Sequence, residues 1–352
     1  MVLENFRRSP DRRTAIEARR RSIQKIFVVG TDLSASADLA VRRALMLGEQ
    51  HGALVVVLHA VPEQGAARLL AERCRRARRL LEDWYGPTGA RRSFGLDIRI
   101  SVGNPATAIT QTAAAVNADL LVFGRPRQRL VTWKVGRSTV ERAIRNSGIP
   151  GLIVNRPPRR PYRKIVLGLT HSATALHAVG KAKELELLDN AEVAVVHAFT
   201  LLGKEKMTFS ELDAANIEDH LARAACDRRT GMRDFLASCG AAELRRSVHA
   251  VQGRPGAVVE RMASEFDAEL VVIGSPSESP LRRVLCGSTA AEIMGRVQCD
   301  VLAVPRPAET GTQCGTAAQG AFGRGSCCAS APASTGPETQ MGSGHPIWGS
   351  ML

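Results

Sequence analysis

The sequence alternates short apolar runs with amphipathic segments, and this series occurs twice along the chain. The runs of the first copy are Ile26–Gly30, Leu54–Val61, Leu96–Val102, Leu120–Phe123 and Leu152–Val154. The runs of the second copy are Ile165–Leu169, Val193–Phe199, Leu244–Val251, Leu270–Ile273 and Val301–Val304. Apolar runs joined by helical segments are typical of parallel strands that helices bury on both faces. We therefore predict an α/β fold of two tandem, doubly wound, five-stranded parallel-sheet domains.

Matched residues in the two copies support a duplication within the chain. His59 and His197 are 138 positions apart, whereas Gly124 and Gly274 are 150 positions apart. The second copy therefore has about 12 additional residues between its second and third strands. The segment 156–162 lies between the copies, and its prolines interrupt both helices and strand ladders. We predict a first domain at 23–155, a linker at 156–162 and a second domain at 163–306.

The two ends of the chain differ in composition from the rest. Residues 1–22 are rich in arginine, and residues 307–352 consist mainly of small residues and proline. Segments of this kind bury too little apolar surface to offset the entropy lost on ordering. We predict a disordered basic arm at 1–22 and a disordered low-complexity tail at 307–352.

Charge and hydropathy limit the partners and the location. The formal net charge of +14 favours nucleotides, nucleic acid or another anionic partner. The sequence has no run of 18 apolar residues and no apolar secretory core near its start, so we predict a cytoplasmic protein without membrane insertion. Its eight cysteines lack the CxxC spacing of zinc sites, so no protein-bound metal is predicted.

Several residues follow strands where doubly wound sheets bind ligands, outside the carboxyl ends of neighbouring strands. In the first copy these residues are Asp32, Gly124 and Ser138. In the second copy they are Thr170, His171, Gly274, Ser277, Gly287, Ser288 and Thr289. Glycine lets backbone amides approach phosphate oxygens, while a helix amino terminus adds its dipole and free amides. A serine or threonine at the helix start adds a hydroxyl group. The pattern indicates a phosphate-binding loop.

These motifs resemble the universal stress protein family, whose nucleotide-binding members carry G-x2-G-x9-G-[ST] after the fourth strand and an aspartate after the first. The resemblance covers about residues 24–155 and 163–306 and implies an adenine-nucleotide alpha-hydrolase-like fold and a role in stress adaptation. The second copy reads Gly274-x2-Ser277-x9-Gly287-Ser288, with Thr170 or His171 where the aspartate belongs. The first copy keeps Asp32 but has Arg127 and Arg137 at the two later glycine positions.

The two copies are therefore expected to differ in ligand binding. In the first copy, the arginines either remodel the loop and remove the site or hold phosphate through their side chains. In the second copy, Gly287 and Ser288 either begin a phosphate-binding helix or only cap it. We predict that ATP or a related adenine nucleotide, with or without Mg²⁺, binds mainly to the second copy. Asp32, Gly124 and Ser138 form the weaker candidate site.

Three further features have two interpretations each. His59 and His197 end equivalent strands, where they either border a base pocket or lie hydrogen-bonded in the core. Cys286 precedes a helix start and is either a reactive thiol or a small filler. The basic helix around Arg68–Arg79 either binds an anionic partner or presents a solvated face, with Leu69 and other apolar residues packed on the sheet.

The residues support one principal function and two alternatives. The principal function is a regulatory nucleotide-binding module whose copies pair as a pseudo-dimer through Leu152–Val154 and Val301–Val304. The first alternative is a weak ATP-hydrolysing enzyme, although the sequence has no P-loop lysine, no paired carboxylates near the glycine loop and no placeable Ser-His-Asp set. No catalytic residue is assigned. The second alternative is a nucleotide-free scaffold that binds a protein or an anionic partner through arginines.

Overall fold

The computed structural model describes residues 25–86, 94–126, 138–200, 214–275 and 288–306. The first half contains β1 (Ile26–Thr31), α2 (Ala35–His51), β2 (Leu54–Val61), α3 (Ala67–Tyr85), β3 (Gly95–Val102), α4 (Pro105–Val116), β4 (Leu120–Gly124), α5 (Thr139–Ser147) and β5 (Gly151–Val154). The second half contains β6 (Lys164–Gly168), α6 (Ala173–Glu184), β7 (Glu192–Phe199), α8 (Ala214–Ser238), η1 (Ala242–Ser247), β8 (Val248–Gln252), α9 (Pro255–Glu265), β9 (Leu270–Ser275), α10 (Ser288–Arg296) and β10 (Asp300–Pro305). The predicted arm and tail lie outside the described residues.

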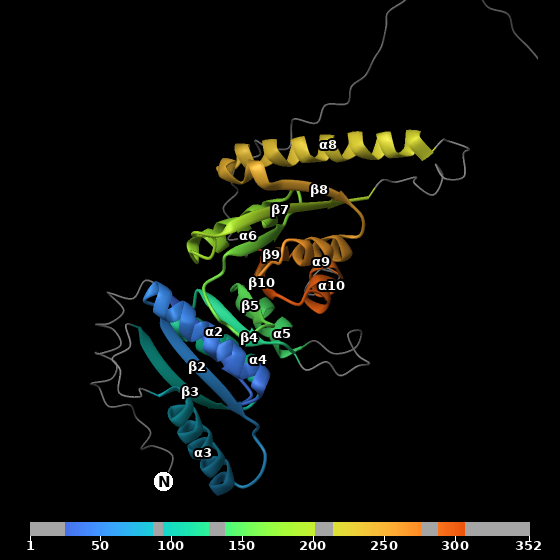
Figure 1. The fold of residues 1–352 in the computed structure, drawn as a ribbon. Coiled ribbons are helices and arrows are strands. Elements are labelled where there is room, and N and C mark those ends of the chain that lie inside the picture. Colours follow the sequence, from blue (N-terminus) through green and yellow to red (C-terminus); the bar gives the residue numbers. More distant parts are fainter. Residues whose placement is uncertain (1–24, 87–93, 127–137, 201–213, 276–287, 307–352) are drawn as a thin grey trace, which may run out of the picture. The chain divides into compact units, whose positions relative to one another are not determined.

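The described strands form one sheet in the order β3-β2-β1-β4-β5-β10-β9-β6-β7-β8 (Figure 1). Within each half, all neighbouring strands run parallel. The halves join where β5 and β10 pair antiparallel, with Leu152 opposite Leu302 and Ile153 opposite Val301. The predicted α/β class is confirmed, and so is the prediction that these two strands meet.

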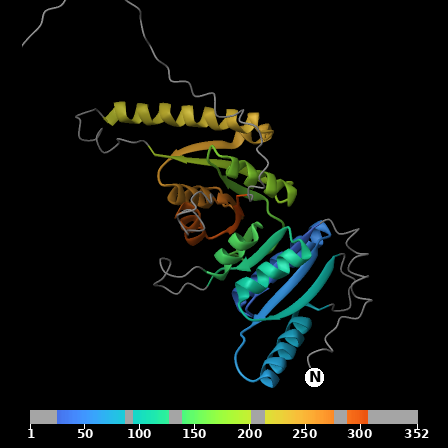
Figure 2. The ribbon, with the colours of Figure 1, turned by 180° about the vertical axis from the view of Figure 1, so that it is seen from behind.

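The sheet has a core on each face, because successive side chains of a strand point to opposite sides. One core lies under α2, α3, α6 and α8, and the other lies under α4, α5, α9 and α10. Figures 1 and 2, which view the sheet from opposite sides, show α2 in front in one and α4 in front in the other. Phe27 and Val28, neighbours in β1, belong to different cores, and neither is more than 1% exposed. Burial on both faces explains why the strands read as continuous apolar runs.

A buried polar cluster joins the halves beside the linker. The Asp300 carboxylate, fully buried in β10, accepts hydrogen bonds from the Tyr162 hydroxyl at 2.6 Å and the Asn155 amide at 2.8 Å. Nε of Arg43, from α2 of the first half, lies 3.2 Å from the same carboxylate, and its guanidinium covers the Tyr162 ring at 4.3 Å. Burial and the nearby Asp300 charge raise the pKa of Tyr162 well above its usual value. Buried charges need such partners, so this cluster fixes the linker against both halves.

Two predicted details of the fold are wrong: the start of one strand and the packing of one helix. The predicted strand at Leu244–Val251 begins only at Val248, because Ala242–Ser247 forms the 3₁₀ helix η1. This short helix buries Leu244 while Arg245 and Arg246 stay exposed, an arrangement that alternation along a strand would not allow. In α3, Leu69 is 45% exposed, because the buried residues Ala77, Leu81 and Tyr85 all belong to the second part of the helix.

Candidate functional site

The strand order of each half reverses at one point, between β1 and β4 in the first half and between β6 and β9 in the second. Doubly wound sheets bind ligands outside the carboxyl ends of the strands at such a reversal, and we refer to these two places as the crevices of the halves. The described site residues at these carboxyl ends are Asp32, Gly124, Ser138, Thr170, His171, Gly274 and Thr289. Ser288 begins α10, but its side chain is not described. Ser277, Gly287, Arg127, Arg137 and Cys286 lie outside the described residues.

The loop after the first strand is built alike in both halves. Ser34 caps α2 by accepting a hydrogen bond from the Ala37 amide at 3.3 Å, and Ser172 caps α6 through the Ala175 amide at 3.2 Å. The two caps are 138 positions apart, the spacing of the matched histidines. Thr170, rather than His171, therefore occupies the position of the first-half aspartate.

The side chains at this position differ in what they can offer. The exposed Asp32 carboxylate accepts a hydrogen bond from the Ser34 amide at 3.0 Å. The exposed Thr170 hydroxyl shares a hydrogen bond of 3.0 Å with the Ser172 hydroxyl. The second half thus presents a neutral hydroxyl where the first presents a carboxylate, so it lacks a charged cation ligand at this point.

Gly124 and Gly274 allow the ends of β4 and β9 to lie against the first turns of α2 and α6. A Cβ atom on Gly124 would lie 2.3 Å from the Ser36 carbonyl oxygen in α2, and one on Gly274 would lie 2.9 Å from the Thr174 carbonyl oxygen in α6. Backbone cannot yield at such distances, so both strand ends need glycine for the helix to approach. Helix packing therefore explains these two glycines without a ligand.

The last helix of the first half has a filled amino terminus. The Ser138 hydroxyl accepts a hydrogen bond from the Glu141 amide at 3.1 Å, and the Ser138 amide donates to the Glu141 carboxylate at 3.2 Å. This capping box places a carboxylate at the positive end of the helix, where a phosphate would bind. The pattern Ser-x-x-Glu could have been detected in the sequence as a cap that competes with an anion.

The last helix of the second half lacks this carboxylate. The residue 150 positions after Glu141 is Ala291, which has no polar side chain. The next residue, Glu292, forms an ion pair with Arg296 at 3.0 Å and lies against Gly256 of α9. The two halves thus differ at the helix end that would receive the phosphate.

The matched histidines are hydrogen-bonded to the sheet. Nδ1 of His59 donates to the Thr31 carbonyl at 2.8 Å, and Nδ1 of His197 donates to the Leu169 carbonyl at 3.0 Å. Burial lowers the pKa of His197, so its imidazole is neutral at physiological pH. These bonds favour the structural interpretation of both side chains.

An exposed aromatic group distinguishes the second half. The His171 ring lies edge-on to His197, with centroids 4.8 Å apart, and 5.4 Å from the Phe235 ring of α8. The α8 helix has Gly231 beside His171, where a Cβ atom would lie at an ordinary contact distance of 3.7 Å from Nε2 of His171. The residue 150 positions before Gly231 is the buried Leu81. No periodic pattern in the sequence indicates the contact between His171 and Phe235, since it depends on how α8 lies on the sheet.

Metal and membrane features are limited in the described part of the chain. There, no group of three or more His, Cys, Asp and Glu side chains is arranged to hold a metal ion. None of the described helices is long and apolar enough to cross a membrane.

Comparison with known proteins finds a family profile that matches both halves of the chain. The profile of the universal stress protein family matches residues 24–155 and again 161–305. A universal stress protein of Synechocystis is 24% identical over 154 residues, which is 41% of this chain and 97% of that protein.

Solved structures share the whole tandem arrangement. A universal stress protein from Archaeoglobus fulgidus superposes with a TM-score of 0.57 at 17% identity, covering 81% of this chain and 97% of its own. A functionally unknown protein from Pseudomonas aeruginosa superposes with a TM-score of 0.51 at 20% identity. The match covers 80% of this chain and 92% of the Pseudomonas chain. At these identities the likeness concerns the fold.

Proposed function

The chain belongs to the universal stress protein family in its tandem form, and on that premise we propose that it is a regulatory module in stress adaptation whose second half binds an adenine nucleotide. The observation that carries this proposal is the asymmetry between the last helices. In the first half the Glu141 carboxylate occupies the amino terminus of α5, whereas α10 has Ala291 at the matching position. A helix start without a competing carboxylate favours a bound phosphate.

The aromatic group beside the second crevice supports a place for the base. His171 is exposed, adjoins Thr170 in sequence and is backed by Phe235 and His197. A ring held in this way offers a surface on which adenine can stack. In this arrangement the phosphates point toward α10 and the base toward α8.

Magnesium, where present, would be bound mainly through the nucleotide. Thr170 has a hydroxyl and no carboxylate, and Mg²⁺ commonly keeps most of its water while bridging phosphate oxygens. The residues therefore fit a nucleotide held by backbone amides and hydroxyls, with modest dependence on the metal. This interpretation favours a binding module over an enzyme that hydrolyses ATP.

The experiment is to denature freshly purified full-length protein and identify what it releases. We expect absorbance at 260 nm and the mass of an adenine nucleotide from the wild type. Protein that releases nothing and shows no heat of binding with magnesium ATP would contradict the proposal and favour a nucleotide-free scaffold. Steady ATP turnover that is proportional to protein concentration would instead support the enzyme.

A further inference from the structure

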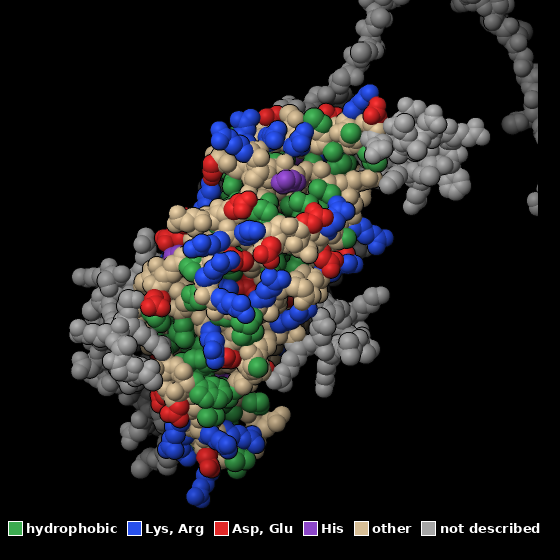
Figure 3. All heavy atoms as spheres, in the orientation of Figure 1, with side chains coloured by type: hydrophobic (Ala, Val, Ile, Leu, Met, Phe, Trp, Pro, Cys, Tyr) green, Lys and Arg blue, Asp and Glu red, His purple; other side chains and the backbone are tan. Residues whose placement is uncertain are grey.

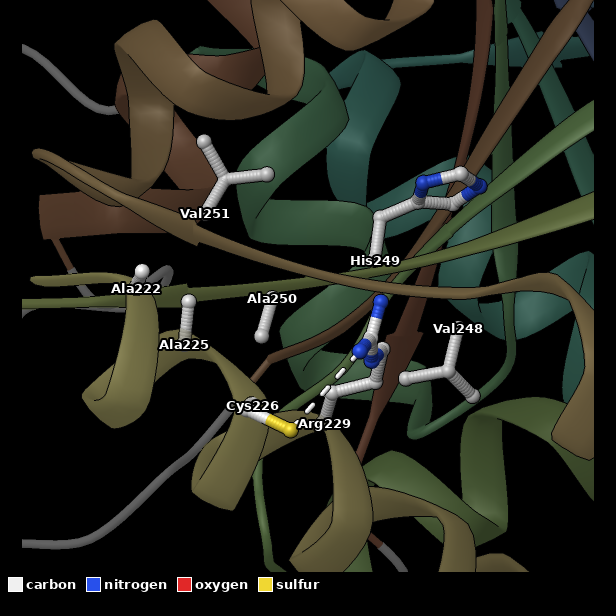
Figure 4. A pocket seen from close by; sticks show the side chains of 8 residues that line it. All are labelled: Ala222, Ala225, Cys226, Arg229, Val248, His249, Ala250 and Val251. Atoms are coloured by element: carbon white, nitrogen blue, oxygen red, sulfur yellow. Dashed lines mark hydrogen bonds between the residues drawn. The ribbon is translucent and has the colours of Figure 1, made fainter. Parts of the chain in front are cut away.

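A hollow lies between α8 and β8 on the side of the second half away from β6. Ala222, Ala225 and Cys226 of α8 and Val248 and Ala250 of β8 line it, and the hollow measures about 200 Å³. Figure 4 shows the α8 residues facing Ala250, while His249 and Val251 point to the opposite face of the strand. Because the α8 side chains here are small, the helix does not fill the space above the strand.

The strand beside this hollow is an edge of the sheet. β8 is the last strand in the sheet order, and among the described strands it pairs with β7 only. An edge strand presents unpaired backbone N–H and C=O groups that can pair with another extended chain. The hollow therefore adjoins backbone groups that can bind a peptide.

Arginines gather at one end of the same seam. A second hollow, of about 460 Å³, is lined by Arg233, Ala242, Arg245 and Arg246, where α8 ends and η1 leads into β8. Arg229 lies one helical turn before Arg233 and borders the first hollow. Figure 3 shows basic side chains over the C-terminal half of α8.

These guanidinium groups are only weakly neutralised. The Asp234 carboxylate lies 4.0 Å from the Arg245 guanidinium. No other described carboxylate lies within 4.0 Å of the guanidinium groups of Arg229, Arg233, Arg245 or Arg246. Arg233 and Arg229 donate hydrogen bonds to neutral atoms, namely the Arg245 carbonyl oxygen at 3.0 Å and the Cys226 sulfur at 3.8 Å. The seam therefore keeps donor capacity for carboxylates.

We propose that the seam between α8 and β8 binds an extended acidic segment of a partner protein. The segment pairs with the edge of β8, places small apolar side chains in the hollow and directs its carboxylates to Arg229, Arg233, Arg245 and Arg246. The residues 150 positions before Arg233, Arg245 and Arg246 are Asp83, Gly95 and Leu96, so the first half repeats only Arg229, which matches Arg79. The proposal stands apart from nucleotide binding, because the arginines lie at the start of β8 and the crevice lies at the carboxyl ends of the strands.

A peptide fits this surface better than nucleic acid or a membrane. The apolar hollow and the strand edge match a peptide backbone with small side chains. Asp227 and Asp234 lie among the α8 arginines and interrupt the continuous positive track that a phosphate backbone would follow.

The probe is a labelled short peptide in which glutamates at one end precede alternating valine and threonine. We expect it to bind the full-length protein in fluorescence anisotropy, and a version with lysines in place of glutamates not to bind. The double variant Arg245→Glu/Arg246→Glu should lose about tenfold or more in affinity. The matched control Arg75→Glu/Arg76→Glu makes the same charge change on exposed residues of α3 and should bind like the wild type.

Two further measurements test the hollow and the strand edge separately. The Ala225→Leu variant fills the hollow without changing charge and should also weaken binding. Bound peptide should slow alkylation of Cys226, which lines the hollow, but not of the exposed Cys239, when both are followed by mass spectrometry. Two peptides can be compared, one N-methylated at the odd-numbered amides and one at the even-numbered amides. Only one of the two should fail to bind, because only one of these sets of N–H groups faces β8.

Several results would overturn the proposal. Equal losses of peptide affinity in Arg75→Glu/Arg76→Glu and Arg245→Glu/Arg246→Glu would mean that the positive protein attracts the acidic peptide non-specifically. Unchanged alkylation of Cys226 would place the peptide elsewhere. Binding of a single-stranded oligonucleotide or of phosphatidylserine vesicles that depends on Arg245 and Arg246, without binding of the acidic peptide, would assign the surface to a different partner.

Discussion

Replacing Ala291 by Glu should give the second half the cap of the first and so weaken nucleotide binding. The change recreates the Ser-x-x-Glu pattern of Ser138 and Glu141, because Ser288 already stands at the matching position. A new carboxylate would bond the helix amino terminus and exclude the phosphate.

The size of the effect follows from the cap in the first half. There, the Glu141 carboxylate and the Ser138 hydroxyl each make one hydrogen bond with a backbone amide, at 3.2 and 3.1 Å. Cap interactions of this kind contribute about 1–2 kcal/mol, which the nucleotide must then displace. We expect magnesium ATP to bind roughly 5- to 30-fold more weakly to Ala291→Glu.

The assay is calorimetry with magnesium ATP, accompanied by thermal unfolding. Because a capping box stabilises a helix, the variant should unfold at or above the wild-type temperature, which separates lost binding from lost folding. Ala291→Gln is the matched control, since it adds a side chain of similar size without charge. Its affinity for magnesium ATP should lie between those of the wild type and Ala291→Glu. Wild-type affinity in Ala291→Glu would refute the assignment of the phosphate to this helix end.

Three further changes test the interface and the crevice. Asp300→Asn removes the buried charge that Tyr162 and an arginine surround, and urea unfolding should show a loss of about 3 kcal/mol, whereas a change below about 1 kcal/mol would contradict the role of the cluster. The hydrogen bond and charge of Lys25 lower the pKa of Glu186, so the stability from this pair is present above the ordinary glutamate pKa and is lost as pH falls through the lowered value. The urea midpoint of Glu186→Gln should therefore fall less than that of the wild type on acidification from pH 7 to about 3. Parallel plots of urea midpoint against pH for the two proteins would contradict a stabilising role of the Lys25–Glu186 pair. Thr170→Asp should tighten magnesium-dependent ATP binding by about tenfold in calorimetry, and an unchanged affinity would place the metal elsewhere.

The sequence predicted those parts of the fold that depend on local pattern. Continuous apolar runs indicated parallel strands, and the open edges of two five-stranded sheets indicated that Leu152–Val154 and Val301–Val304 would meet. The run at Leu244 was assigned to a strand because apolar residues recur from Leu244 to Val251, although the two consecutive arginines after Leu244 break the alternation of a strand. Only the position of α8 over η1 makes a 3₁₀ turn the better way to bury Leu244.

The candidate site was predictable in position but not in detail. Loop location follows from strand order, whereas the role of Gly124 and Gly274 depends on how closely a helix crosses each strand end. The clusters around Asp300 and His171 join residues that are far apart in sequence, and a single chain carries no signal for such contacts. Whether the second crevice binds a nucleotide, and through which residues, stays a prediction.

The stoichiometry of magnesium ATP bound to the full-length wild-type protein tests the account most directly. One helix end is filled by Glu141 and the other has Ala291, so calorimetry should give one nucleotide for each chain. Glu141→Ala should leave that number and the affinity unchanged as long as Arg127 and Arg137 remain in the first loop. Two equivalent nucleotides for each chain, or a single nucleotide lost on changing first-half residues alone, would contradict the account.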